Sequence, residues 1–201
     1  MLRDTASILN TISCTCRVTD SEGRVNPATP NMISNKLFST TNGDTLTFQK
    51  LIEGCSFGHF QVSTDYPADI SQHLSAEGVI DVNIGISLEG NDKFEVTEAA
   101  QLAVEEKIGY QLSTFRGGIF HHVLMIFEGC YTDCGYSAFS FSNGFISGYI
   151  DDYWSYPSVV VHEIGHNLNL HVSKGAVVLC TFLNKSSSIL LFQYIAFGWY
   201  G

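Results

Sequence analysis

The chain has 201 residues, of which 45% are hydrophobic and 15% charged, and its net charge is −10. This balance is typical of a folded protein rather than a disordered one, and the length allows one sizeable core or two small ones. Ten Lys and Arg residues stand against twenty acidic ones. We therefore expect no nucleic-acid partner, because phosphate binding depends on basic side chains.

The first thirty residues are polar and rich in turn sequences, and they predict only a short strand near residues 16–18. No apolar stretch of the signal-peptide kind follows Met1, so either the protein is not secreted or its true start lies upstream. We assign residues 1–30 to an N-terminal segment that is a candidate for the end of a pro-region.

Four short elements are predicted next. A short helix is predicted at residues 31–38, where apolar residues cluster on one side, and a second helix at residues 47–54, with Gly54 near its C-terminus. Residues 59–63 follow as a strand, and the alternation of apolar and polar residues at 79–84 predicts a half-buried strand.

The longest helical period lies at residues 97–112, and its apolar face is suited to cover a sheet. Residues 122–127 are almost all apolar, which is typical of a central strand buried on both faces. Residues 137–150 alternate small, polar and aromatic residues around Asn143-Gly144, which predicts a hairpin turn or a bulge.

A histidine pair then marks the helix predicted from Ser158 to about Leu170, with Pro157 in its first turn. His162 and His166 are four residues apart, so on a helix they project about 40° from each other and form a metal-binding pair. Glu163 lies beside the first histidine, where its carboxylate can take a proton from water without binding the metal. The pattern H-E-x-x-H therefore predicts a zinc site with a general base.

The six cysteines do not match a paired C-x₂-C zinc pattern, and they favour a disulfide-containing extracellular domain of undetermined connectivity. Two apolar runs follow the histidine helix, at residues 176–183 and 189–200. Neither reaches the roughly 20 residues that span a bilayer, so we expect no integral membrane span.

The chain resembles the gametolysin family of zinc metallopeptidases, in the metzincin clan. Four segments carry the resemblance, which covers roughly residues 16–171. They are residues 162–170, 156–158, 119–123 and 55–58. The resemblance implies a secreted zinc endopeptidase that acts on protein or glycoprotein substrates, since the family's namesake is associated with the hydroxyproline-rich cell wall of green algae.

The fold implied by the resemblance is α/β and zincin-like (metzincin-type). It has a twisted mixed sheet, a backing helix at residues 97–112 and a metal-binding active-site helix. Residues 31–171 would form the catalytic domain, in partial form.

The third metal ligand departs from the family pattern, which places a histidine ten residues after the first. That position is Val172 here, and His171 stands one residue early. A continued helix would point His171 away from His162, so the chain must leave the helix near Asn169 for His171 to bind. No Asp or Glu follows Glu163, which leaves His171 as the expected third zinc ligand, with Cys180 a remote candidate.

The family also has a Met in a tight turn below the metal, whereas no Met follows Met125 here. We therefore expect the C-terminal subdomain to be missing. The atypical apolar residues 172–201 would then lie outside the family domain. One hypothesis is that they are translated from an unspliced intron.

Four aromatic residues near the metal helix are candidates for a substrate groove, and core packing beneath the helix is an equal alternative. They are Tyr149, Tyr153, Trp154 and Tyr156. The strand at residues 140–150 is a candidate edge for an extended peptide. His121 and His122 are adjacent on a strand and point to opposite faces, so we do not expect them to share a metal.

The sequence thus favours a zinc-dependent endopeptidase, with His162, His166 and His171 as ligands and Glu163 as base. The alternative is a truncated or degenerate peptidase-like domain that binds a partner and turns nothing over. A third reading, an intracellular metal-binding protein, requires all six thiols to be reduced.

Overall fold

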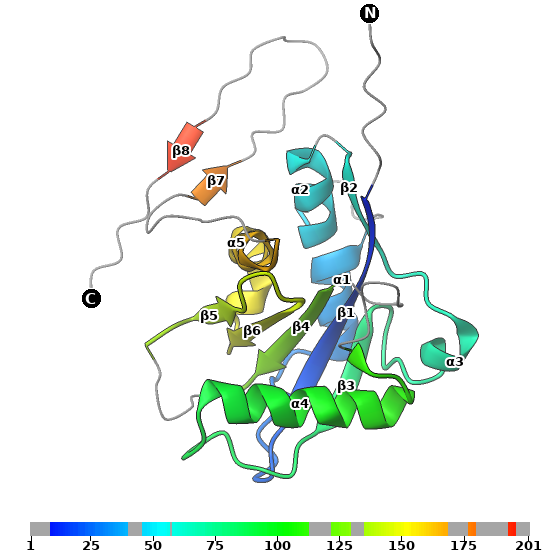
Figure 1. Ribbon diagram of the computed structural model, residues 1–201, viewed down its shortest axis with the longest axis vertical. Helices are drawn as coiled ribbons and strands as arrows, with labels where there is room; N and C mark the ends of the chain where they lie inside the picture. Colours follow the sequence, from blue (N-terminus) through cyan, green and yellow to red (C-terminus); the bar gives the residue numbers. More distant parts are fainter. Residues whose placement is uncertain are drawn as a thin grey trace, which may run out of the picture.

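The computed structural model describes residues 9–39, 46–56, 58–112, 122–129, 135–168, 177–179 and 193–195. A mixed six-stranded sheet lies at its centre, with helices on both faces (Figure 1). The fold is therefore α/β, as the sequence predicts. Among the residues that the structure describes, no helix is both long and apolar enough to cross a membrane.

The sheet is built around β1 (Leu9–Thr19), which pairs with three strands. On one side it pairs in turn with β2 (Phe60–Ser63) and β3 (Val79–Asn83), and on the other with β4 (His122–Phe127). All three pairings are parallel. This strand falls within residues 1–30, the segment that the sequence separates from the catalytic domain.

Only a short strand near residues 16–18 was expected here, and that expectation is wrong in length. The polar residues Thr11, Ser13 and Thr15 alternate with apolar residues and suggest a half-exposed segment, yet all three are buried. Thr is β-branched and suits a strand, and the Ser13 hydroxyl donates a hydrogen bond to the His122 carbonyl at 3.5 Å.

The far side of the sheet leads to the histidine helix. There β4 pairs in parallel with β6 (Ile146–Ile150), and β6 pairs antiparallel with β5 (Ala138–Ser140). The predicted hairpin is confirmed, and Asn143 in its turn has a φ of 56°. The order β2-β1-β4-β6-β5 makes β5 an edge strand. The candidate edge at residues 140–150 is therefore corrected, because β6 lies inside the sheet.

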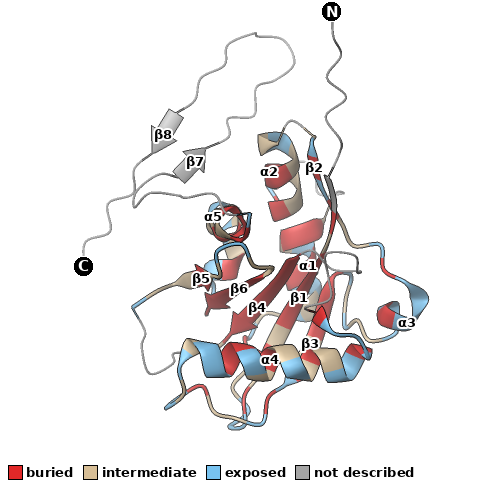
Figure 2. Ribbon diagram, in the orientation of Figure 1, coloured by how far each residue is buried: buried red, intermediate tan, exposed pale blue. Residues whose placement is uncertain are grey.

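One face of the sheet is covered by α4 (Lys93–Ile108), and the other by α1 (Pro30–Phe38), α2 (Phe48–Cys55) and α5 (Pro157–Asn167) (Figure 1). Two apolar cores result, and the strands β4 and β6 between them are buried throughout (Figure 2). β4 serves both cores, since all its residues are buried and alternate side chains enter opposite cores, as its continuous apolar run predicts.

The backing helix α4 starts four residues before the sequence-predicted position. Asp92 accepts hydrogen bonds from the backbone N–H groups of Phe94 and Glu95, and the Glu95 side chain accepts one from Asp92 N–H. This capping box fixes the start of the helix. Gly109, with a φ of 75°, ends it.

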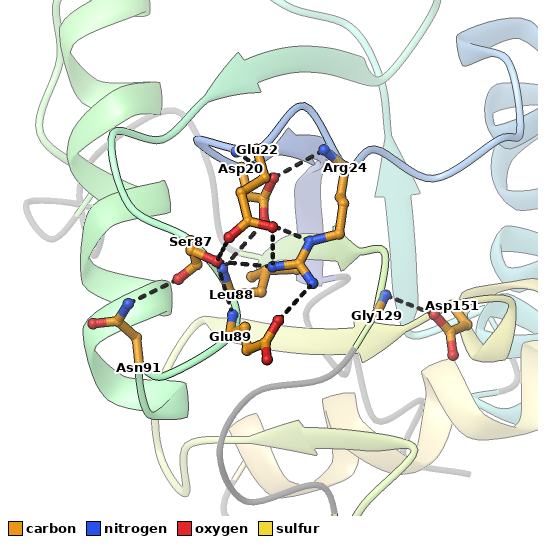
Figure 3. A network of polar contacts seen from close by, with 9 residues as sticks. All are labelled: Asp20, Glu22, Arg24, Ser87, Leu88, Glu89, Asn91, Gly129 and Asp151. Atoms are coloured by element: carbon orange, nitrogen blue, oxygen red, sulfur yellow. Dashed lines mark hydrogen bonds and ion pairs between the residues drawn. The ribbon is translucent and has the colours of Figure 1, made fainter.

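A buried carboxylate fixes the turn after β1 to the loop before α4 (Figure 3). Asp20 accepts hydrogen bonds from the N–H groups of Glu22, Arg24 and Leu88 and from the Arg24 guanidinium. Burial would raise the pKa of Asp20, but these donors hold it below its ordinary value. Arg24 also donates a hydrogen bond to the Ser87 hydroxyl at 2.8 Å. The cluster therefore has a structural role, which is to hold the two loops together.

The remaining elements are short. They are α3 (Ala68–Ser71), the 3₁₀ turn η2 (Tyr153–Ser155), β7 (Val177–Leu179) and β8 (Gln193–Ile195). β7 pairs antiparallel with β8.

Candidate metal centre

The helix α5 carries three stripes of side chains with different surroundings. Its start at Pro157 agrees with the preference of proline for the first helical turn, and it ends at Asn167 rather than near Leu170. Val160 and Ile164 are buried in the core between α1, α2 and the sheet. This packing fixes the rotation of the helix and hence the direction of its other two stripes.

The second stripe is the histidine pair. The ring centroids of His162 and His166 lie 4.9 Å apart with their planes at 87°. Both side chains are half-buried. Burial, with a smaller contribution from His166, lowers the pKa of His162 and so favours its neutral form, which is the form that binds a metal.

The third stripe faces the β5–β6 hairpin and contains Glu163 and Asn167. Glu163 is buried, with 7% of its surface exposed, and its Oε2 accepts a hydrogen bond from the Ser140 hydroxyl at 2.8 Å. Burial raises the pKa of the Glu163 carboxyl to about 6, although the hydrogen bond from Ser140 opposes the rise. A carboxyl group with this pKa can both accept and return a proton near neutral pH.

The end of α5 is held to the hairpin turn by three hydrogen bonds. The Asn167 amide donates to the carbonyls of Phe141 and Ile146, at 3.0 Å each. In return, the N–H of Asn143 donates to the His166 carbonyl at 3.1 Å. The hairpin therefore fixes the helix at the histidines, and it supports both Glu163 and the histidine pair.

The four groove candidates separate into two groups. Tyr149 and Trp154 are buried, with exposed fractions of 0% and 5%, and both belong to the core beside α5. Core packing is thus the correct alternative for these two. Tyr153 and Tyr156 are exposed just before the helix, with ring centroids 6.1 Å apart.

The third expected ligand, His171, and the remote candidate Cys180 lie outside the described residues. In the described part of the chain, no three His, Cys, Asp or Glu residues are grouped to hold a metal. His122, on β4, is buried, lies 3.1 Å from the Ser147 hydroxyl and has its pKa lowered to about 3 by burial.

The cysteines within the described residues differ in state. Cys55 is disulfide-bonded, whereas Cys14 and Cys16 are free thiols buried on β1. The other three, Cys130, Cys134 and Cys180, lie outside the described residues.

Two supporting residues were missed from the sequence, namely Ser140 and Asn167. Asn167 had a usable signal, because it lies four positions after Glu163 and so shares its helix face. Ser140 had none, since its contact with Glu163 depends on the register of β5 against β6.

The chain was compared with protein-family models, with curated proteins and with solved structures, and none of these comparisons found a match.

Proposed function

We propose that this protein is a zinc-dependent endopeptidase with a zincin-like fold. The observation that carries the proposal is the arrangement on α5. Two adjacent imidazoles, His162 and His166, lie on one face, and between them in sequence a buried carboxyl, Glu163, has its pKa raised to about 6. A surface pair of histidines on an ordinary helix would give no reason for burying a carboxylate beside them.

The donor set suits zinc. Imidazole nitrogens are common zinc ligands, and the lowered pKa of His162 keeps its ring ready to bind. We propose His171 as the third ligand, and α5 ends before it, as such a ligand requires. When bound, zinc supplies Lewis acidity to the scissile carbonyl and to the attacking water.

Glu163 is the proposed general base. Because its Oε2 already accepts the Ser140 hydroxyl, Oε1 is the atom that takes the proton from water. The protonated carboxyl then gives this proton to the leaving amine. A pKa of about 6 suits both steps, since the group is ionised at neutral pH and remains basic enough to accept a proton.

The proposed substrate is an extended segment of a protein or glycoprotein. β5 is an edge strand and lies beside α5, so a peptide that pairs with its edge would pass next to Glu163. The mixed α/β sheet, with α4 on one face and α5 on the other, supports the zincin-like part of the proposal. A secreted location is part of the same proposal.

The test compares Glu163→Gln with Glu106→Gln, the same substitution at an exposed position of α4. We expect casein or gelatin cleavage by the wild type and by Glu106→Gln. Glu163→Gln should retain zinc and lose at least about 99% of the activity, because it lacks the base. Equal activity in the two variants would refute the mechanism, and zinc binding without cleavage by the wild type would indicate a non-catalytic binding module.

A further inference from the structure

The edge strand β5 presents different groups on its two faces. Phe139 faces the core beneath α4, and its ring packs on Gly148 of β6 so closely that a Cβ at Gly148 would lie 2.3 Å from it. Ala138 and Ser140, on alternate positions, face α5 instead. The fit of Phe139 over Gly148 therefore fixes the register that brings Ser140 to Glu163.

The register also determines which backbone groups lie at the free edge. The N–H of Ile150 donates to the Ser137 carbonyl at 3.0 Å, and Phe139 lies opposite Gly148. In an antiparallel pair, hydrogen-bonded residues alternate with residues whose backbone groups point outward. The backbone groups of Ser137 and Phe139 thus point to β6, whereas those of Ala138 and Ser140 point away from the sheet.

Ser140 consequently acts in two directions. Its backbone N–H and C=O point away from β6 and pair with no other strand among the described residues, and its hydroxyl donates to Glu163 Oε2 at 2.8 Å. Glu163 is buried, so few alternative donors from water reach it. The hydroxyl of Ser140 therefore contacts the proposed general base, while the backbone of the same residue lies at the edge where a peptide would pair.

We propose that Ser140 is the positioning residue of this site. Its hydroxyl holds one oxygen of Glu163 so that the other accepts the proton, and its backbone sets the depth of the bound peptide relative to that oxygen. This inference rests on the proposed peptidase function. A purely structural role, in which the hydrogen bond only ties β5 to α5, makes different predictions.

The variants are Ser140→Ala, Ser140→Thr and the control Ser142→Ala, which removes an exposed hydroxyl from the same hairpin. For Ser140→Ala we expect kcat to fall about tenfold and KM to change less than about twofold, because the base is misplaced and the backbone edge is intact. Ser140→Thr retains the hydroxyl and should restore most of kcat. Ser142→Ala should equal the wild type.

A second measurement does not depend on catalysis. The ¹³C resonance of the Glu163 carboxyl, assigned by its loss in Glu163→Gln, reports the hydrogen bond in the metal-free protein. We expect Ser140→Ala to shift this resonance, Ser140→Thr to restore it and Ser142→Ala to leave it unchanged. The unfolding temperature of each variant, measured alongside, detects a structural effect.

The outcomes separate the two proposals. If the wild type cleaves peptides and Ser140→Ala keeps its kcat within about twofold, the inference about Ser140 is overturned and the peptidase stands. If Ser140→Thr is as impaired as Ser140→Ala, the hydroxyl is not the cause and the inference is also overturned. If the wild type cleaves nothing, both proposals fail, even where the carboxyl resonance shifts.

Discussion

Asn167 provides a quantitative test of how the helix α5 is held against the β5–β6 hairpin. Its amide donates to two carbonyls of the hairpin, those of Phe141 and Ile146, and the residue is buried with 7% of its surface exposed. The Phe141 carbonyl keeps a second donor, the N–H of Gly144 at 2.9 Å, so losing Asn167 costs about 1 kcal/mol there. Leaving the Ile146 carbonyl short of a donor costs about 1–3 kcal/mol.

Asn167→Ala should therefore lower the free energy of unfolding by about 2–3 kcal/mol. This range includes a small stabilising contribution, because the substitution removes Asn167 Oδ1, which is buried without a hydrogen-bond partner among the described residues. Asn167→Asp should be worse at neutral pH, since a carboxylate would face two carbonyl oxygens.

The assay is urea denaturation of the metal-free protein, with Ser158→Ala as the control at an exposed position of the same helix. The two Asn167 variants should lower the midpoint with the slope unchanged, and the control should stay within about 0.5 kcal/mol of the wild type. A loss below about 0.5 kcal/mol for Asn167→Ala, or equal stability of Asn167→Asp and the wild type, would contradict this account of the contact.

Three further predictions concern the sheet beside the site. Ala138→Pro removes an N–H from the free edge without touching the β6 ladder, so KM for a protein substrate should rise about tenfold while stability changes little; an unchanged KM would exclude docking at this edge. Gly148→Ala should lower the free energy of unfolding by about 1–3 kcal/mol, because the new methyl group meets the Phe139 ring, whereas Gly135→Ala, in open space, should not. Finally, the pKa of His122 is lowered from 6.5 to about 3 in the folded state, so its contribution to stability is complete above pH 6.5 and is lost as the pH falls towards 3. The slope is at most about 1.4 kcal/mol per pH unit, and urea titrations at several pH values should show a smaller slope for His122→Gln.

Local patterns predicted much of the fold correctly. The helices at residues 31–38 and 47–54, the backing helix and the buried strand β4 all follow from apolar periodicity, which reports the face that an element buries. The helix α5 follows from the same reasoning, because the spacing of His162 and His166 fixes their relative direction once a helix forms.

The errors arose where a long-range contact decides the structure. β1 runs between β2, β3 and β4, and this central position buries hydroxyls that alone suggest a surface segment. Likewise, Tyr149 was a groove candidate because it precedes α5, but its position on β6 places its ring in the core. Ser140 was missed for the same reason, since only the pairing of β5 with β6 places it at Glu163.

Zinc content tests the central claim most directly. The wild-type chain, His162→Ala and the control His59→Ala, an exposed histidine before β2, would be dialysed against limiting zinc and measured by mass spectrometry of the bound metal. We predict close to one zinc per chain for the wild type and for His59→Ala, and a loss of most of it for His162→Ala. Wild-type protein that retains no zinc, or zinc that remains in His162→Ala, would contradict a metal centre on α5.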